Sequence, residues 1–264
     1  MKTQIILRKV HYAFSAFLCT ACLVSCNDWL KPEPLSFYSP ENTYVTKEGL
    51  EGALVSCRAM IRPEFIGNNS YACTELMTSD VAVAGNIVAQ TLKNFEIQLK
   101  PGAYGDSQIG TFWSKGYSAI QKANTIISRV QAADEITEND KNTILAEGYF
   151  HRSYWYYKLV NQFGDVPFID KEVTTPKLDF YSHTRSSILK RLREDMMFAT
   201  RYLPENAPHG AVSKAAGNHL LAKICLACCD FDGAVAATTA VIDHSQHKLM
   251  EKRFGVNISD AQYN

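Results

Sequence analysis

The chain has 264 residues, of which 46% are hydrophobic and 20% charged, and its 27 basic residues balance its 27 acidic residues. This length and apolar content suffice for one full hydrophobic core or two small ones, and they exclude a largely disordered chain. The balanced charge gives no indication of nucleic-acid binding.

Residues 1–25 have the pattern of a secretory signal peptide. Lys2, Arg8 and Lys9 precede an apolar run that is shorter than the roughly 20 residues needed to span a bilayer. The letters LVSC at 23–26 resemble a bacterial lipobox, in which cleavage before the cysteine makes its thiol the lipid attachment site. We therefore predict that Cys26 is acylated and that the mature chain has a net charge of −3. The alternative is an ordinary signal peptide with an incidental cysteine.

Residues 26–45 are predicted to be a tether behind the lipid. Pro32, Pro34 and Pro40 in KPEPLSFYSP forbid a regular helix and keep the backbone extended. The mature chain has no later run of about 20 apolar residues, so we expect any membrane attachment to come from the lipid.

Residues 46–264 are predicted to form one mainly α-helical domain. Apolar residues recur every three or four positions along most of it, as on one face of a helix. Residues 64–110 lack this period and are interpreted as loops with a helical piece near 72–79. The predicted helices are 46–61, 111–133, 137–163, 185–202, 213–229 and 232–245.

The boundaries of the helix at 137–163 follow from its end residues. Thr137 stands three residues before Asp140, an approximate capping signature. Gly164 is a plausible left-handed terminator, and Pro167 prevents the helix from continuing. The letters FGDVPF at 163–168 are interpreted as a turn.

The last two predicted helices have the spacing of a tetratricopeptide repeat, with the letters DFD at 230–232 as their link. The letters CLACC at 225–229 fall inside this pair, and we interpret Cys225, Cys228 and Cys229 as reduced, buried packing residues. A metal or redox role is the alternative. Packing positions are predicted at Leu221, Ala222, Cys225, Ala234, Thr238 and Val241.

The charged and aromatic residues of 146–157 are expected to serve packing. Glu147 and His151, four apart, can meet on one helix face. Arg152, five residues from Glu147, must find its partner on another helix. The aromatic residues surround the helix on every side and are predicted to serve mostly core and inter-helix packing. They are Tyr149, Phe150, Tyr154, Trp155, Tyr156 and Tyr157.

Four sequence stretches together resemble the SusD/RagB family of outer-membrane nutrient-binding lipoproteins. They are WSKGYSAIQKANTII, AEGYFHRSYWYYKLVNQFGDVPFI, REDMMFATRYLP and SKAAGNHLLAKICLACCDFDGAVAATTAVI, in this order behind a lipobox. Gly148 and His151 depart from the family, which more often has Ala and Leu there. The resemblance implies an all-α, tetratricopeptide-like scaffold with irregular loops. In the family a loop-rich C-terminal half follows, which this sequence lacks, so we expect the chain to be truncated; a scaffold that has lost binding is the alternative.

The resemblance also directs the search for a binding site to residues 71–110, because the family binds nutrients through loops in this part of the chain. Asp80 occupies a position that resembles a recurrent acidic one. Asn86, Tyr104 and Asp106 are chosen by side-chain type alone. Turn and cap duties are the alternative for all four residues.

The implied function is capture of a glycan or other oligomeric nutrient at the cell surface, with a SusC-like TonB-dependent transporter as partner. The protein would be lipid-anchored in the outer membrane. No cofactor, metal or catalysis is expected, because no diagnostic carboxylate pair or catalytic motif occurs. The alternative is a lipid-anchored helical scaffold that binds only protein partners.

Overall fold

The chain divides between residues 42 and 43 into two units, and the computed structural model describes residues 43–65, 108–208 and 210–244 of the second. The predicted helical piece at 72–79 lies outside this part. The described elements are α3 (Lys47–Phe65), α7 (Gln108–Val130), α8 (Glu138–Phe163), β1 (Val166–Pro167), β2 (Ser182–His183), α9 (Arg185–Tyr202), α10 (Lys214–Ala227) and α11 (Phe231–His244).

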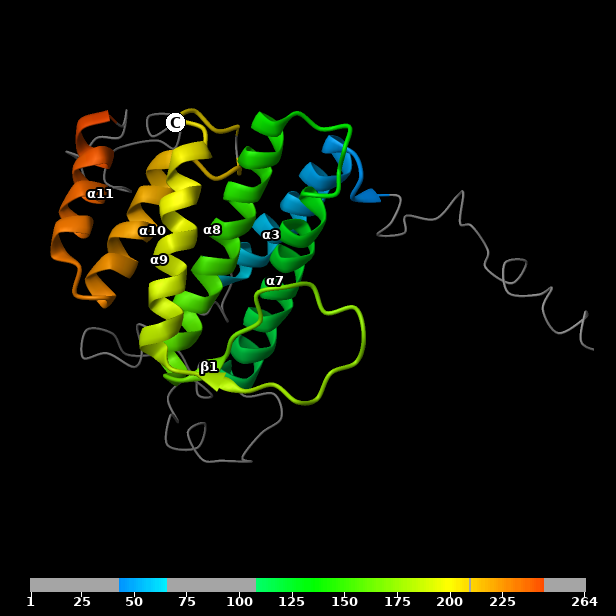
Figure 1. Cartoon of the computed structure of the whole chain (residues 1–264). Helices are drawn as coiled ribbons and strands as arrows, with labels where there is room; N and C mark the ends of the chain where they lie inside the picture. Colours follow the sequence, from blue (N-terminus) through cyan, green and yellow to red (C-terminus); the bar gives the residue numbers. More distant parts are fainter. Residues whose placement is uncertain (1–42, 66–107, 209, 245–264) are drawn as a thin grey trace, which may run out of the picture. The chain divides into compact units, whose positions relative to one another are not determined.

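The helices pack around α8, as Figure 1 shows. α8 contacts α3, α7, α9 and α10, and the stack continues from α9 through α10 to α11. Short links join α7 to α8 and α10 to α11, so each of these pairs packs as a helical hairpin. The prediction of an all-α, tetratricopeptide-like scaffold is confirmed.

Helix ends are fixed by side-chain caps. The hydroxyl of Thr137 accepts a hydrogen bond from the backbone N–H of Asp140 at 3.2 Å, as predicted. Gly164 ends α8 at φ 74°, and its N–H donates to the carbonyl of Val160. Thr184 and Ser213 cap α9 and α10 in the same way as Thr137 caps α8. Each cap satisfies a backbone donor that the first helical turn leaves unpaired.

The buried faces follow the apolar periodicity. The predicted row on α9 is entirely buried, and so are three of the four predicted positions on α3. The aromatic residues of α8 lie in the core or pack against it, as predicted. Trp155 and Tyr156 are fully buried, and Trp155 packs on Phe112 with ring centroids 6.0 Å apart. The buried row of α9 consists of Ile188, Leu192, Met196, Ala199 and Leu203.

Polar side chains also tie α3 to α8. Arg58 donates to both carboxylate oxygens of Glu147, at 2.5 and 2.9 Å, and Nε2 of His151 lies 3.5 Å from the same carboxylate. The predicted contact between Glu147 and His151 is confirmed. Burial alone would raise the pKa of Glu147, but the nearby His151 ring and the hydrogen-bonded Arg58 guanidinium hold it below its ordinary value. Buried Glu64, the penultimate residue of α3, pairs with Lys158 of α8.

Three details at the last hairpin correct the sequence interpretation. Cys225 is buried, but Cys228 is the half-buried C-cap of α10 and Cys229 is exposed at φ 58°, so the prediction that all three are buried was wrong. The link between α10 and α11 comprises residues 228–230 and not the predicted 230–232. Asp230 occupies the N-cap position of α11, where its carboxylate accepts a hydrogen bond from the N–H of Gly233. Thr238, a predicted packing position, is exposed, and its neighbour Ala237 faces the core instead.

The outer face of α11 is apolar and uncovered by the described residues. Phe231, Val235 and Ile242 lie on one side of this helix and are all exposed, and Leu226 at the end of α10 is exposed too. Stacked helical repeats need a cap with a polar outer face.

In the described residues, no helix is both long enough and apolar enough to cross a membrane.

Close approach of α7 and α8 depends on Gly148. A Cβ atom at this position would lie 3.1 Å from Cγ1 of Ile127, which is tighter than ordinary packing. We expect Gly148→Val to lower the free energy of unfolding by about 1–3 kcal/mol because the extra methyl groups overpack this interface. Denaturant unfolding of the purified protein measures the change.

Gly52→Val on α3 is the matched control. Gly52 is also helical, but a Cβ atom there meets nothing within 4 Å. This variant should be neutral or slightly more stable, because a helical glycine is itself unfavourable. Equal effects of the two substitutions would contradict the packing argument.

Candidate functional site

The longest irregular segment among the described residues connects β1 to β2. It spans residues 168–181 and is called the strap below. Val166 pairs antiparallel with His183, which closes the base of the strap and corrects the interpretation of FGDVPF as a simple turn. Long loops inside a helical domain are uncommon and usually functional.

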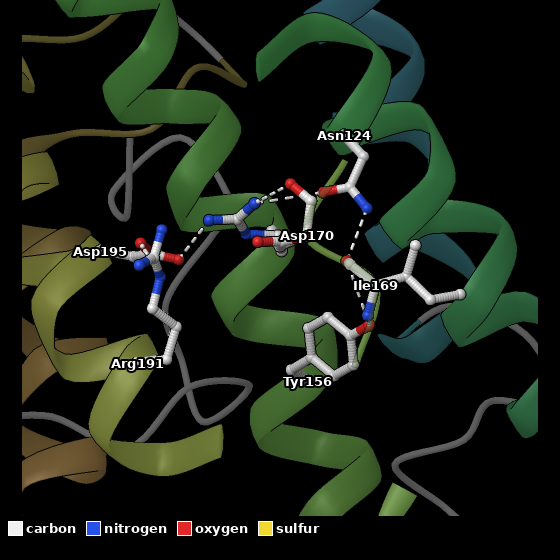
Figure 2. Close-up of polar contacts among 7 residues, drawn as sticks. Asn124, Tyr156, Ile169, Asp170, Arg191 and Asp195 are labelled. Atoms are coloured by element: carbon white, nitrogen blue, oxygen red, sulfur yellow. Dashed lines mark hydrogen bonds and ion pairs between the residues drawn. The ribbon is translucent and has the colours of Figure 1, made fainter. Parts of the chain in front are cut away.

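The strap is held to the helices by the guanidinium of Arg152, which is only 1% exposed. Its Nη1 donates to the backbone carbonyl of Asp170 in the strap at 2.9 Å and to Oδ1 of Asn124 on α7 at 3.3 Å. Its Nη2 donates to Oδ2 of Asp195 on α9 at 2.5 Å, and Arg191 approaches the other oxygen at 3.2 Å (Figure 2). The prediction that Arg152 pairs with another helix is confirmed.

Two further side chains, Asn124 and Tyr156, fix the beginning of the strap through the backbone of Ile169. The side-chain amide of Asn124 donates to the carbonyl of Ile169 at 2.7 Å. The backbone N–H of Ile169 donates to the hydroxyl of Tyr156 at 2.6 Å, so both backbone groups of Ile169 are satisfied (Figure 2). Burial raises the pKa of Tyr156, which keeps this hydroxyl neutral.

The middle of the strap is fastened to α7. Arg129 donates to both carboxylate oxygens of Glu172, at 2.8 and 3.1 Å, and the side chain of Gln121 donates to the carbonyl of Val173 at 3.2 Å. A bidentate arginine–carboxylate pair fixes orientation as well as distance. The strap therefore has a defined path over α7 as far as Val173.

Between the strap and α7 lies an open pocket of about 450 Å³. Its walls are mainly apolar, and two threonines, one glutamine and one lysine supply polar groups. This composition is typical of small-molecule sites, where a few polar groups orient a ligand between apolar walls. The lining residues are Tyr117, Ile120, Gln121, Ile169, Val173, Thr174, Thr175, Pro176, Lys177 and Phe180.

The outer part of the strap presents aromatic rings to solvent. Phe180 is 39% exposed and Tyr181 is 78% exposed, and Leu178 beside them is completely exposed. By contrast, the aromatic residues of α8 pack against other helices. The strap thus offers ring faces that a ligand could cover.

All of the site residues proposed from the sequence lie outside the described residues. These are Cys26, Asp80, Asn86, Tyr104 and Asp106. In the described part of the chain, no group of three or more histidine, cysteine, aspartate or glutamate side chains could hold a metal ion.

Sequence reasoning missed the strap pocket. One signal was available: TTPKLDFY at 174–181 combines a turn-forming proline with two adjacent aromatic residues between two helices. The resemblance directed attention to residues 71–110 instead. No local pattern could show that this segment folds back onto α7.

Comparison with known proteins identifies the family. Residues 50–226 match the sequence profile of a SusD-like family described as "Starch-binding associating with outer membrane". The chain belongs to this SusD-like family. The SusD-like protein P2 of Formosa agariphila is 29% identical over 243 residues, which cover 90% of this chain and 47% of that protein.

Solved structures show the same fold. A SusD superfamily protein from Bacteroides vulgatus superimposes with a TM-score of 0.69 at 19% identity, over 84% of this chain and 48% of that one. A laminarin-binding SusD-like protein gives a TM-score of 0.65 at 22% identity, over 76% and 46% of the two chains. The chain spans about half the length of the curated relatives it matches.

Loss of Arg152 should destabilise the fold in a pH-dependent way. Burial raises the pKa of Asp195, and the neighbouring Arg152 opposes this rise. Arg152→Met leaves the Asp195 carboxylate buried without its closest cation, which should cost about 3–5 kcal/mol of unfolding free energy at neutral pH. Because the pKa of Asp195 then rises further, the folded state takes up a proton more readily, and the deficit should shrink from pH 8 to pH 5.

Denaturant unfolding of Arg152→Met and of the wild type at several pH values measures this deficit. Arg191→Met is the control, because Arg191 is 46% exposed and should contribute at most about 1 kcal/mol. The double variant Arg152→Met/Asp195→Asn should recover part of the loss. A deficit that is independent of pH would contradict the proposed coupling.

Proposed function

We propose that this protein binds carbohydrate at the outer membrane as the nutrient-capturing partner of a transporter. The observation that carries the proposal is the match of residues 50–226 to the SusD-like family, whose description names starch binding and association with the outer membrane. The name of one structural neighbour, a laminarin-binding protein of the same fold, agrees with a glycan ligand. The mechanism would be binding without bond cleavage.

The strap supports this proposal. Apolar C–H faces of a pyranose ring are covered well by aromatic rings that face solvent, and Phe180 and Tyr181 are such rings. Thr174 and Thr175 line the adjacent pocket and supply hydroxyl groups that can donate to or accept from sugar hydroxyls. Asp80, Asn86, Tyr104 and Asp106, in residues 71–110, would add further contacts.

Membrane attachment would come from acylated Cys26. A lipid anchor of several acyl chains at about 0.8 kcal/mol per buried methylene would hold the protein firmly. The partner we propose is a SusC-like TonB-dependent transporter, on the basis of the family resemblance. The helical stack would then serve as the rigid body that holds the binding loops over that partner.

One observation favours a second function, a lipid-anchored scaffold that binds only proteins. Phe231, Val235 and Ile242 leave an apolar face of α11 exposed, and such faces commonly mark contact surfaces. A glycan-binding measurement separates the two functions, because a scaffold of this kind would bind no oligosaccharide.

The strap aromatic residues provide the first test. The full chain, purified in detergent, should bind at least one class of oligosaccharide in a glycan array. Tyr181→Ala should weaken that binding about tenfold, as expected from the loss of roughly 55 Å² of covered apolar surface. Tyr202→Ala, at an exposed aromatic residue of α9 outside the strap, is the control. Absence of oligosaccharide binding would leave the protein-binding scaffold as the better proposal.

Cys26 provides the second test. Cys26→Ala in a host with a lipoprotein pathway should yield unprocessed precursor or protein that is released from the membrane. Mass spectrometry of the N-terminal peptide and partition between detergent and water phases measure the change. Cys22→Ala, at a cysteine within the signal peptide, should leave acylation intact. An acylated product of the Cys26→Ala variant would contradict the assignment.

A further inference from the structure

We infer that the strap pocket receives a negatively charged sugar residue, whose acidic group pairs with Lys177. This inference rests on the proposed glycan-binding function and adds a substrate class to it. The observation behind it is the charge of the pocket lining. Of the described residues that line the pocket, Lys177 is cationic and none is acidic.

The ammonium group of Lys177 is available to a ligand. Its Nζ lies 5.5 Å from the centroid of the Phe180 ring, which places it at the pocket wall. Among the described residues it makes no ion pair. A cation–π contact at an exposed site is weak, so the ammonium can turn toward an anion without a large loss of interaction energy.

No carboxylate of the described pocket lining competes with a ligand for Lys177. Glu172 is held by both nitrogens of Arg129, and Asp165 accepts a hydrogen bond from the backbone N–H of Arg185. Asp170 and Asp179 are exposed and do not line the pocket. Among the residues that line the pocket, an acidic ligand would therefore meet a cation and no carboxylate.

The remaining walls suit a sugar ring that carries an acidic group. Val173 and Pro176 provide an apolar surface, and Phe180 provides a ring next to the cation. A carboxylate or sulfate on the sugar can form charge-assisted hydrogen bonds with the ammonium while the C–H face lies on these walls. A neutral sugar would leave the ammonium without an ionic partner.

The pocket is also preorganised on its α7 side. Gln121 belongs to the lining, and its side chain already donates to the carbonyl of Val173. The Tyr117 hydroxyl donates to the carbonyl of Pro167 at 2.8 Å. Because these groups are fixed before binding, less conformational entropy is lost when a ligand binds.

The test compares matched acidic and neutral ligands on the full chain, purified in detergent. Oligogalacturonates and their fully methyl-esterified forms share a backbone and differ only in the carboxylate charge. Sulfated galactan oligosaccharides and their desulfated forms test whether a sulfate group, in place of a carboxylate, pairs with Lys177. We expect the acidic member of one pair to bind at least fivefold more tightly than its neutral counterpart, by calorimetry at fixed ionic strength.

Lys177→Gln should abolish this preference, so that the acidic and neutral members of the pair bind equally. Lys171→Gln is the matched control, since it removes the same charge from an exposed strap residue outside the pocket. Equal binding of charged and neutral ligands, or equal effects of the two substitutions, would overturn the inference while neutral glycan binding still supports the proposed function. Failure to bind any oligosaccharide would overturn both.

Discussion

A guanidinium group buried in the middle of a helical stack constrains most of this structure. Removing a cation from water is expensive unless charged and polar partners surround it. Arg152 has such partners on α7, on α9 and in the strap, through Asn124, Asp195 and the carbonyl of Asp170. Three separate parts of the chain must therefore be in place around α8 before this charge is satisfied, so the packing of the helices and the path of the strap are coupled.

This coupling explains how an irregular segment can form a binding surface. The strap has no helix or sheet of its own beyond its two-residue strands, yet Ile169 and Glu172 are hydrogen-bonded to side chains of the helices. The anchored half lies on the scaffold, and the other half presents Lys177, Phe180 and Tyr181 to solvent. Binding groups on loops above a rigid scaffold are a common arrangement, because the scaffold carries the stability and the loops carry the specificity.

Family membership gives this arrangement its context. The relatives are about twice as long as this chain, and the match covers the helical scaffold rather than their full length. Within the described residues, the stack ends at α11 with an apolar outer face. The residues that match the family model contain both most of the helical scaffold and the whole strap.

The sequence by itself determined the helices, because apolar period, capping residues and terminators act within a few residues of one another: Thr137, Gly164 and the buried row of α9 were all predictable. It also showed that Arg152 needs a partner on another helix. Only the tertiary structure decided which partner, since Asp195 is 43 residues away. The strap pocket and the exposure of Cys229 likewise depend on contacts between distant segments and on the backbone at the end of α10, which no local pattern encodes.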